Sequence, residues 1–503
     1  MWDRAILLHG QGRYGDALDC LIALEARLPD HPGLLANLGV ALTATSFHLP
    51  GCIARGAYPV CENHLHFRLS NRYNRLTCCF RVPTRFQSEA AKIMPIITRR
   101  ELGRAGLLLL ARGRNSSGAS GLDETLRSAV ERRKIPAAAA MVSTAEKTIW
   151  SGAFGKRDSA SGVDVTTGFI FGIASMTKAI TSTAALQLVE AGKVKLDEPV
   201  AKHLPQLGKL EVLRGFDRST GKPVLRPAAK PVTLRRLLTH TSGFAYDTWD
   251  ENMFRYAAQA GSAAPGSVPP LMFEPGTRWQ YGTSVDWAGR LVEAVSGQTL
   301  EQYFQRNILE PLGMKDTSYI LPPEKFDRLV STWQRQRDGS LAQDPRKQPD
   351  PPKSFNGGGG LYSTVGDYTR FMQMILRRGR GASSEQILQT KTVETMATNQ
   401  IGGLSAGKMK SFRPDRSSDV QFHPGFTDGF SLGFLINGTA YEGGRSAGSL
   451  AWAGLYNTFY WIDPHRGLCA VLMMQFLPFV DKDAVGVLND FERGVYATVA
   501  AGG

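Results

Sequence analysis

The sequence predicts an α+β fold in which one antiparallel sheet is assembled from both ends of the region 121–503 and flanked by helices. A mainly helical lobe is inserted at about residues 195–350. Three observations predict this fold: a helix and two strand-like runs follow residue 121, two strand-like runs and a helix close the chain, and a long segment separates the two groups. Such an order is typical of a sheet layered against helices.

The first elements of the catalytic region follow from the spacing of apolar residues. Three of these residues recur at every fourth position: Leu122, Leu126 and Val130. This period predicts a helix over 122–133, and Pro136 ends the helical pattern. The runs 137–143 and 148–155 are rich in residues that favour strands, so we expect two strands there.

The last elements are predicted in the same way. Residues 458–462 and 468–474 are β-rich runs, and the segment 463–467, which reads Asp-Pro-His-Arg-Gly, is typical of a turn between them. Residues 483–500 have the pattern of a closing helix. The strands of both groups therefore complete one sheet, and 121–503 forms one catalytic domain.

The segments before this domain carry weaker patterns. Residues 1–45 resemble one tetratricopeptide unit and the start of the next, which cannot bury its apolar face alone. Residues 46–120 are predicted to be a linker that includes an export-signal-like stretch, where two arginines precede a short apolar run. If translation starts at residue 1, the protein is expected in the cytoplasm, whereas a start at Met94 would predict export to the periplasm.

The charge and hydropathy of the chain narrow the choice of partners. The formal net charge is +14, but the basic residues are scattered and no run of five or six Lys or Arg occurs, so nucleic acid is not an expected partner. No uncharged apolar run reaches about 18 residues, so no membrane span is expected. The oligomeric state is left open by the sequence.

The cysteines argue against a disulfide in 121–503 and against a metal site in the segment before it. Five of the six cysteines precede residue 94, and Cys469 is the only one after it. The four residues Cys52, Cys61, His64 and His66 have a spacing that matches no common zinc template. We therefore expect neither a metal site nor an organic cofactor.

The nucleophile candidate is a serine followed three residues later by a lysine. This pattern occurs three times, at 175–178, 219–222 and 405–408, and only the first copy opens a long helical pattern. A helix brings residues i and i+3 to one side, so the Lys178 amine can reach the Ser175 hydroxyl. A serine hydroxyl needs such a neighbour to become a useful nucleophile.

Four more motifs accompany this pair in a specific order. They are Leu-Thr-His-Thr-Ser-Gly at 238–243, Pro-Gly-Thr-Arg-Trp-Gln-Tyr at 275–281, four glycines at 357–360 and Trp-Ala-Gly at 452–454. With them, residues 121–500 resemble the serine β-lactamase and penicillin-binding-protein superfamily. Within it, they are most similar to the family VIII carboxylesterases and the lovastatin-type acyltransferases.

The resemblance implies the roles of the site residues. Ser175 would be the nucleophile and Lys178 its activating amine, and Tyr281 would match the family tyrosine that carries the serine proton to the leaving group. The backbone N–H groups of Ser175 and Leu455 would form the oxyanion hole. We read 238–243 as a structural loop rather than as the histidine of a Ser-His-Asp triad, and the glycines at 357–360 as backbone passing close to the active-site helix.

The third motif departs from the β-lactamase pattern. Trp452, Ala453 and Gly454 stand where β-lactamases carry Lys-Thr-Gly, which helps to bind the substrate carboxylate, and Thr283 stands where the family usually has Asn. We expect 452–454 to bind substrate and to place an aromatic wall beside the acyl site. This change favours a neutral ester.

These features together imply a carboxylesterase that hydrolyses small-molecule esters through an acyl-serine intermediate. Three aromatic residues of the inserted lobe are expected to line its cleft: Trp249, Phe254 and Trp279. The alternatives are a β-lactamase or D,D-peptidase, an acyltransferase that uses the same intermediate, and a non-catalytic binding module, against which the intact set of reactive groups argues.

Overall fold

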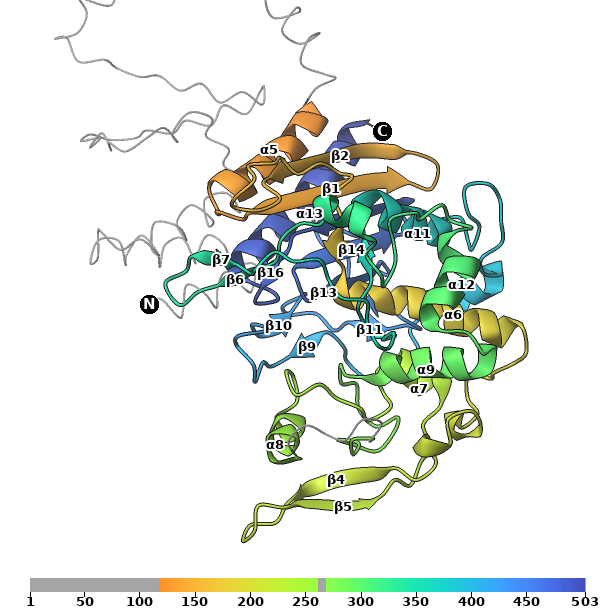
Figure 1. Ribbon diagram of the computed structural model, residues 1–503. Coiled ribbons are helices and arrows are strands. Elements are labelled where there is room, and N and C mark those ends of the chain that lie inside the picture. The colour runs from red at the N-terminus through yellow and green to blue at the C-terminus, as the bar shows by residue number, and fades with distance from the viewer. Residues whose placement is uncertain (1–116, 261–267, 503) are drawn as a thin grey trace, which may run out of the picture. The chain divides into compact units, whose positions relative to one another are not determined.

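A computed structural model describes residues 117–260 and 268–502 of this chain (Figure 1). The tetratricopeptide-like segment 1–45, nearly all of the linker 46–120 and the start at Met94 lie outside the described residues, so the predictions for them stay predictions. None of the described helices combines the length and the apolar composition that crossing a bilayer requires.

A seven-stranded antiparallel sheet forms the centre of the catalytic region. Its strand order is β11-β12-β13-β14-β15-β1-β2. The strands are β1 (Ala137–Thr144), β2 (Thr148–Gly155), β11 (Gly429–Phe430), β12 (Leu435–Ile436), β13 (Leu450–Gly454), β14 (Thr458–Asp463) and β15 (Leu468–Met473). Because β1 pairs with β15, with Ala139 opposite Met473, the prediction of a sheet built from both ends of the region is confirmed.

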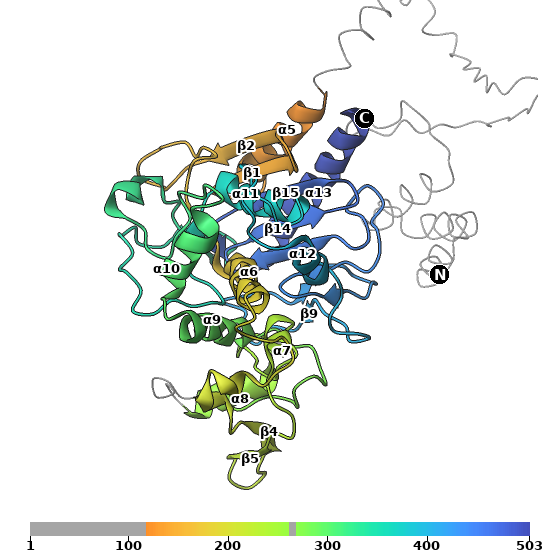
Figure 2. The same cartoon turned by 90° about the vertical axis from the view of Figure 1, so that its right-hand side faces the viewer.

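Helices cover both faces of this sheet, as predicted. The helices α5 (Ser117–Glu131) and α13 (Lys482–Gly502) lie side by side along one face, and α11 (Val365–Leu376) packs on β1 and β15 (Figures 1 and 2). Neighbouring residues of β14 point to opposite faces. Trp461 contacts Phe491 of α13, whereas Tyr460 contacts Tyr368 of α11. Both faces of β14 are therefore buried, which explains its continuous apolar run.

The segment between β2 and β11 holds the rest of the elements. Its helices are η3 (Ala174–Met176), α6 (Thr177–Glu190), η4 (Val200–Lys202), η5 (Pro205–Leu207), α7 (Leu234–Leu238), α8 (Glu251–Ala260), α9 (Ser284–Ser296), α10 (Leu300–Phe304), η6 (Gln305–Leu309), η7 (Pro323–Arg328) and α12 (Thr390–Met396). Its strands are β3 (Phe171–Gly172), β4 (Glu211–Phe216), β5 (Pro223–Pro227), β6 (Trp333–Arg335), β7 (Leu341–Gln343), β8 (Tyr362–Ser363), β9 (Lys408–Met409) and β10 (Val420–Gln421), and β16 (Phe476–Leu477) follows β15.

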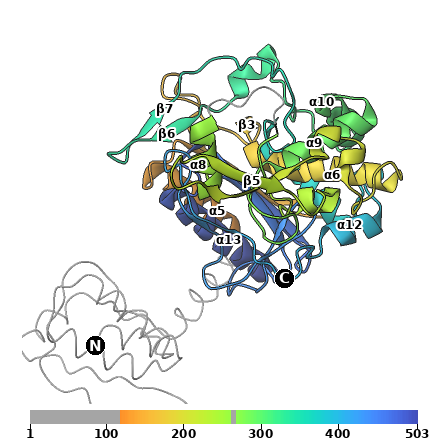
Figure 3. The same ribbon diagram turned by 90° about the horizontal axis from the view of Figure 1, so that it is seen from below.

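The predicted lobe at 195–350 contains a β-hairpin as well as helices. The β4–β5 hairpin lies away from the large sheet (Figures 1 and 2) and beside α8 (Figures 1 and 3). Leu213 of the hairpin buries its side chain with Met272 and Phe273 in a small cluster, and Met253 of α8 packs against it. The hairpin therefore packs on a small core of its own, while Val212 on the same strand belongs to the large core.

The sequence placed the outer elements of the sheet within a few residues. The predicted strand 148–155 coincides with β2, and the predicted helix 483–500 lies within α13. The predicted helix 122–133 begins five residues after α5 does and ends two residues later than α5. Such small differences at helix ends are ordinary, because terminal turns fray.

The packing of α13 onto the sheet yields a stability prediction. The Phe491 ring is fully buried, with centroids 5.9 Å from Trp150 and 5.8 Å from Trp461. Replacing Phe491 by Ala leaves a cavity between helix and sheet, so we expect the free energy of unfolding to fall by about 3–5 kcal/mol in urea titrations. Arg493→Ala, on the exposed side of α13, should change it by less than about 1 kcal/mol. Equal effects of the two changes would contradict this packing.

Candidate active site

Ser175 lies at a strained turn between a strand and a helix. It belongs to η3, which follows β3 and leads directly into α6. Ala174, the residue before it, has a φ of 42°, in the left-handed region that residues with a Cβ seldom adopt. Such strain persists only where the surroundings hold it. The Ser175 side chain is partly exposed and lines a cavity of about 530 Å³.

The Lys178 amine joins Ser175 to two other segments. Lys178 is 2% exposed, and its Nζ donates to Ser175 Oγ at 3.1 Å, to the Gly358 carbonyl oxygen at 2.6 Å and to Tyr246 Oη at 3.4 Å. Three acceptors match the three N–H donors of an ammonium group. The spacing of three residues therefore brings amine and hydroxyl together as the sequence predicted.

The glycines at 357–360 pass directly along α6. The Thr181 hydroxyl donates to the Gly357 carbonyl at 2.7 Å, one turn after the bond from Lys178 to Gly358. On the other side of the loop, the Gly358 N–H donates to Asp286 Oδ1 at 2.6 Å. A Cβ at Gly358 would lie 2.2 Å from that oxygen. The prediction that this loop is backbone close to the active-site helix is confirmed.

Tyr246 and Asp286 are site residues that the sequence reasoning missed. The Tyr246 hydroxyl accepts from Lys178 and donates to Asp286 Oδ2 at 3.5 Å. Burial, followed by the charge of Asp286, raises the pKa of Tyr246 well above its usual value, so this phenol keeps its proton. Burial also raises the pKa of Asp286, and Lys178 opposes that effect. We infer that Tyr246 positions the amine rather than accepting a proton.

Tyr281 lies in a cage of rings next to the amine. The Lys178 Nζ is 4.8 Å from the centroid of its ring, and the rings of His240 and Trp452 are each 4.8 Å away. The Trp452 indole N–H donates to the Tyr281 hydroxyl at 3.3 Å. Tyr281 is thus held close to Lys178, and its role in carrying the proton stays a prediction.

The Trp-Ala-Gly motif lies on β13, which packs against η3. A Cβ at Gly454 would lie 2.3 Å from the Ile173 carbonyl oxygen, so only glycine lets the strand come this close. Trp452, Ala453 and Gly454 do not line the cavity that contains Ser175, whereas Leu455 does. Their contact with substrate stays a prediction, and the indole of Trp452 is directed to Tyr281 instead.

Two backbone amides are free to form the predicted oxyanion hole. Within residues 117–260 and 268–502, neither the Ser175 N–H nor the Leu455 N–H has a hydrogen-bond acceptor. Both residues line the same cavity and are partly exposed there. The assignment of an oxyanion hole is untested, and the free donors fit what it requires.

The aromatic wall differs from the expected one. Trp249 lines the cavity, as expected. Phe254 is 39% exposed and stacks on Phe412, so it does not line the cavity. Trp279 is buried against Phe430 and likewise faces away from the cavity. Only one of the three expected aromatic residues therefore lies in the cleft, because the direction of a side chain depends on tertiary contacts that the local sequence does not show.

The position of His240 does not support a role as the base of a Ser-His-Asp triad. Its ring is buried against Tyr281, and its Nδ1 has no hydrogen-bond partner among the described residues. The Gly-x-Ser-x-Gly spacing of a nucleophile elbow does occur, at 403–407, 429–433 and 444–448. All three copies lie in segments that precede or connect short strands, and none forms the strand-to-helix turn that an elbow needs. None of these serines is thus placed as the nucleophile of a Ser-His-Asp triad, which agrees with the interpretation of 238–243 as a structural loop.

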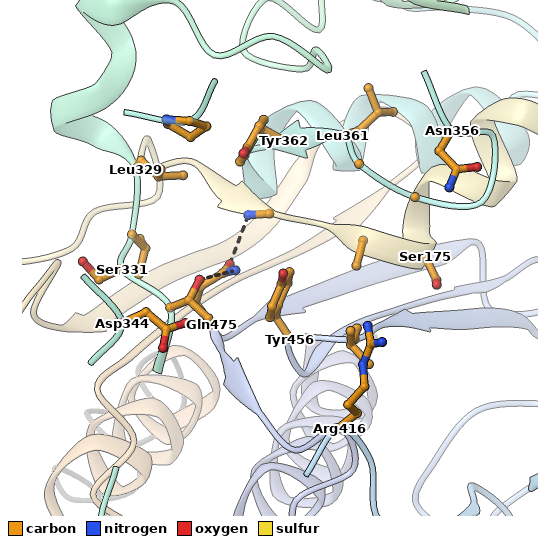
Figure 4. Close-up of a pocket in the computed structure, with 18 of the residues that line it drawn as sticks. Ser175, Leu329, Ser331, Asp344, Asn356, Leu361, Tyr362, Arg416, Tyr456 and Gln475 are labelled. Carbon is orange, nitrogen blue, oxygen red and sulfur yellow. Dashed lines mark hydrogen bonds between the residues drawn. The ribbon is translucent and has the colours of Figure 1, made fainter. Parts of the chain in front are cut away.

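The cavity around Ser175 is polar as well as aromatic (Figure 4). Its charged and amide lining residues are Asp247, Asp344, Arg346, Lys347, Asn356, Arg416 and Gln475. Gln475 is fixed, because its Oε1 accepts the Gly172 N–H at 3.1 Å. In the part of the chain that the structure describes, no three His, Cys, Asp or Glu side chains are grouped as metal ligands, and Cys469 is buried.

A serine that precedes a buried helix, a lysine one turn later on its hydroxyl, and a strand with free amides beside them define a serine enzyme of the Ser-x-x-Lys class. The beta-lactamase family profile matches residues 122–492. The chain therefore belongs to the beta-lactamase family, which includes serine hydrolases and acyltransferases, and the resemblance seen in the sequence is confirmed.

Named relatives include both transferases and a hydrolase. The chain is 34% identical over 348 residues to the monacolin J acid methylbutanoyltransferase of Aspergillus terreus, a match that covers 66% of this chain and 82% of the relative. It is 30% identical over 402 residues to the lovastatin esterase of Penicillium rubens, covering 76% and 99%. A mutant of simvastatin synthase from Aspergillus terreus has a similar structure, with a TM-score of 0.67 and 31% identity over 77% of this chain and 99% of that one.

The two tyrosines near Lys178 should differ in their effect on catalysis. If Tyr281 carries the proton, Tyr281→Phe lowers kcat about 10²–10⁴-fold on 4-nitrophenyl butyrate. Tyr246→Phe removes one acceptor from Lys178, so we expect about a 10-fold loss that falls on kcat rather than on KM. The reverse order of the two losses would make Tyr246 the proton carrier.

The buried His240 should make stability depend on pH. Burial, followed by Lys178, lowers the pKa of His240 well below its usual value of 6.5. Below pH 6.5 the unfolded chain binds a proton that the folded chain does not, so the free energy of unfolding falls as the pH falls. Between pH 7.5 and 5.5 the free energy of unfolding of the wild type should fall by about 1.4 kcal/mol more than that of His240→Asn. Asparagine is the replacement because it tolerates the left-handed backbone of this position (φ 56°).

The control for this effect is His465→Asn, at an exposed position in the turn between β14 and β15. In urea titrations, the free energy of unfolding of this variant should change between the two pH values by the same amount as that of the wild type. A constant difference between wild type and His240→Asn across the two pH values would show that His240 does not titrate as its burial predicts.

Proposed function

We propose that this chain is an acyltransferase that forms an acyl-enzyme at Ser175 and passes the acyl group to the hydroxyl of a small molecule. The observation that carries the proposal is the Ser175–Lys178 pair, 3.1 Å apart, at the wall of a cavity of about 530 Å³. That volume accommodates an acyl group together with an acceptor. Relatives named as acyltransferases support transfer over hydrolysis.

The proposed first half of the reaction acylates the enzyme. Ser175 Oγ attacks the carbonyl carbon of the donor while Tyr281, acting as a phenolate next to the Lys178 ammonium, takes the serine proton. The amides of Ser175 and Leu455 donate to the oxyanion of the tetrahedral intermediate. The intermediate collapses, the bond to the leaving group breaks, and Tyr281 returns the proton to that group.

The second half repeats these steps with a new nucleophile. The acceptor hydroxyl gives its proton to Tyr281 and attacks the acyl carbon, and the Ser175 oxygen leaves and is reprotonated. Water in place of the acceptor would give hydrolysis by the same steps. The product therefore depends on what the cavity binds beside the acyl group.

Ester hydrolysis is the second candidate, and one observation favours it. The relative with 99% of its length matched is named lovastatin esterase. A carboxylesterase would use the same Ser175, Lys178 and Tyr281 and would differ only in admitting water to the acyl-enzyme.

The fate of the acyl group separates the two candidates. With 4-nitrophenyl butyrate as donor and benzyl alcohol as acceptor, we expect benzyl butyrate to form, with a yield relative to butyrate that rises with alcohol concentration. Chromatography measures both products. Formation of butyrate alone at every alcohol concentration would make the enzyme an esterase, and nitrocefin turnover at the ester rate would make it a β-lactamase.

The nucleophile itself is tested by substitution. Ser175→Ala should reduce both products about 10⁴-fold or more, because the acyl-enzyme can no longer form. The matched control is Ser405→Ala, which changes an exposed copy of the same Ser-x-x-Lys pattern and should behave as the wild type. Ester turnover that survives Ser175→Ala would overturn the mechanism.

A further inference from the structure

Asp286 is joined to the Lys178 amine by two bridges of one residue each. In the first bridge, the Lys178 Nζ donates to the Gly358 carbonyl oxygen at 2.6 Å, and the Gly358 N–H donates to Asp286 Oδ1 at 2.6 Å. In the second, the amine donates to the Tyr246 hydroxyl at 3.4 Å, and that hydroxyl donates to Asp286 Oδ2 at 3.5 Å. The third N–H of the amine stays on Ser175 Oγ, so the carboxyl group acts on the amine through the bridges alone.

The hydrogen bonds of Asp286 fit a carboxylate and not a carboxylic acid. An ionised carboxylate only accepts hydrogen bonds. The Gly358 N–H can only donate, and the Tyr246 hydroxyl, whose oxygen already accepts from Lys178, gives its own proton to the second carboxylate oxygen. Asp286 also lies in the first turn of α9, where the free N–H groups of a helix favour negative charge. Both oxygens are thus arranged to hold a charge.

The charged and titratable groups that face Asp286 come from four segments. Burial raises the pKa of Asp286, and the charges of Lys178 and Arg290 oppose that effect. Arg290 is exposed on α9, so water screens its charge, whereas the Lys178 amine is buried. Burial, followed by the charge of Asp286, raises the pKa of Tyr246 and of Tyr319 well above the usual value. Both phenols therefore keep their protons.

Two rings face the other side of the amine. The centroid of the Tyr281 ring is 4.8 Å from the Lys178 Nζ, and the Trp452 indole N–H donates to the Tyr281 hydroxyl at 3.3 Å. Burial, followed by the charge of Lys178, lowers the pKa of His240, so that ring stays neutral. A donor on the phenol oxygen favours the phenolate, and a carboxylate bridged to the amine favours the ammonium. Tyr281 and Lys178 are therefore biased toward opposite charges.

A proton shared by Lys178 and Tyr281 has two places to rest, and only one of them leaves Tyr281 able to act as a base. We propose that Asp286 is a positioning residue whose negative charge keeps this proton on Lys178, so that the free site holds an ammonium beside the Tyr281 phenolate. The phenolate then takes the proton of Ser175 directly. The proposal rests on the proposed acyl chemistry at Ser175, and it gives a task to a carboxylate that does not line the cavity.

Asp286→Asn tests the proposal because it removes the charge and keeps the size of the side chain. The measurement is the pH dependence of kcat/KM on 4-nitrophenyl butyrate, in which the acid limb reports protonation of the base and the alkaline limb reports loss of the ammonium proton. Without the carboxylate, the phenolate forms more readily and the ammonium is lost more readily. We therefore expect both limbs to move to lower pH by about 1 unit. A fall of kcat/KM at every pH with both limbs unmoved would show a merely structural role and overturn the proposal.

Two further variants make the direction of the shift specific. Asp164→Asn removes one negative charge from a side chain that is 79% exposed and lies outside the lining of the cavity, so both limbs should stay where the wild type has them. Trp452→Phe removes the donor from Tyr281, so the acid limb should move the opposite way, to higher pH. An equal shift in Asp164→Asn, or a shift of the acid limb to lower pH in Trp452→Phe, would contradict the proposal.

The charge of Lys178 is also measurable without turnover. In protein whose lysines carry ¹³C at Cε, the Lys178 signal is assigned by its absence from Lys178→Arg, and its chemical shift distinguishes ammonium from amine. We expect the amine form to appear at a pH about 1 unit lower in Asp286→Asn than in the wild type. If the wild type turned over no ester, the acyl chemistry would fail, and this titration would still decide the role of Asp286. Identical titrations in the two proteins would overturn it.

Chemical rescue provides a second variant if Asp286→Asn does not fold. Asp286→Ala leaves space for formate, which supplies a carboxylate, or for formamide, which has the same size and no charge. We expect formate to raise kcat/KM of this variant about 10-fold and formamide to leave it unchanged. Equal effects of the two molecules would mean that filled space, rather than charge, is what Asp286 supplies.

Discussion

The hydrogen bond from the Lys178 amine to the Ser175 hydroxyl is the interaction on which the rest of the site depends. An amine that is 2% exposed is costly to bury unless acceptors surround it. Those acceptors come from three places: the turn before α6, the loop that contains Tyr246, and the glycines before β8. Satisfying one buried amine therefore requires three distant segments to meet, and the fold around it serves that requirement.

Close backbone contacts make this meeting possible. Gly454 lets β13 reach the carbonyl of Ile173, and Gly358 lets its loop reach Asp286, where a Cβ would lie 2.3 Å and 2.2 Å from an oxygen, respectively. Any larger residue would push the strand away from Ser175 or the loop away from Lys178. These glycines thus contribute by letting two backbone segments come close together, and not by a reactive group of their own.

The sequence predicted the features that depend on local spacing and missed the contacts between residues that are far apart in the chain. The strands and the closing helix follow from periodicity, and Ser175 and Lys178 could be paired because three residues span one helical turn. Tyr246 and Asp286 lie 68 and 108 residues from Lys178, and no local pattern marks a contact over such separations. The same limit explains why Trp249 alone, of three expected aromatic residues, lines the cavity.

The third motif shows how one strand can change its task within this family. In the β-lactamase pattern, the lysine at this place helps to bind the substrate carboxylate, whereas Trp452 gives its only polar hydrogen to the hydroxyl of Tyr281. The Trp452 side chain is uncharged and its N–H is engaged with Tyr281, so this strand position offers no cation to a substrate.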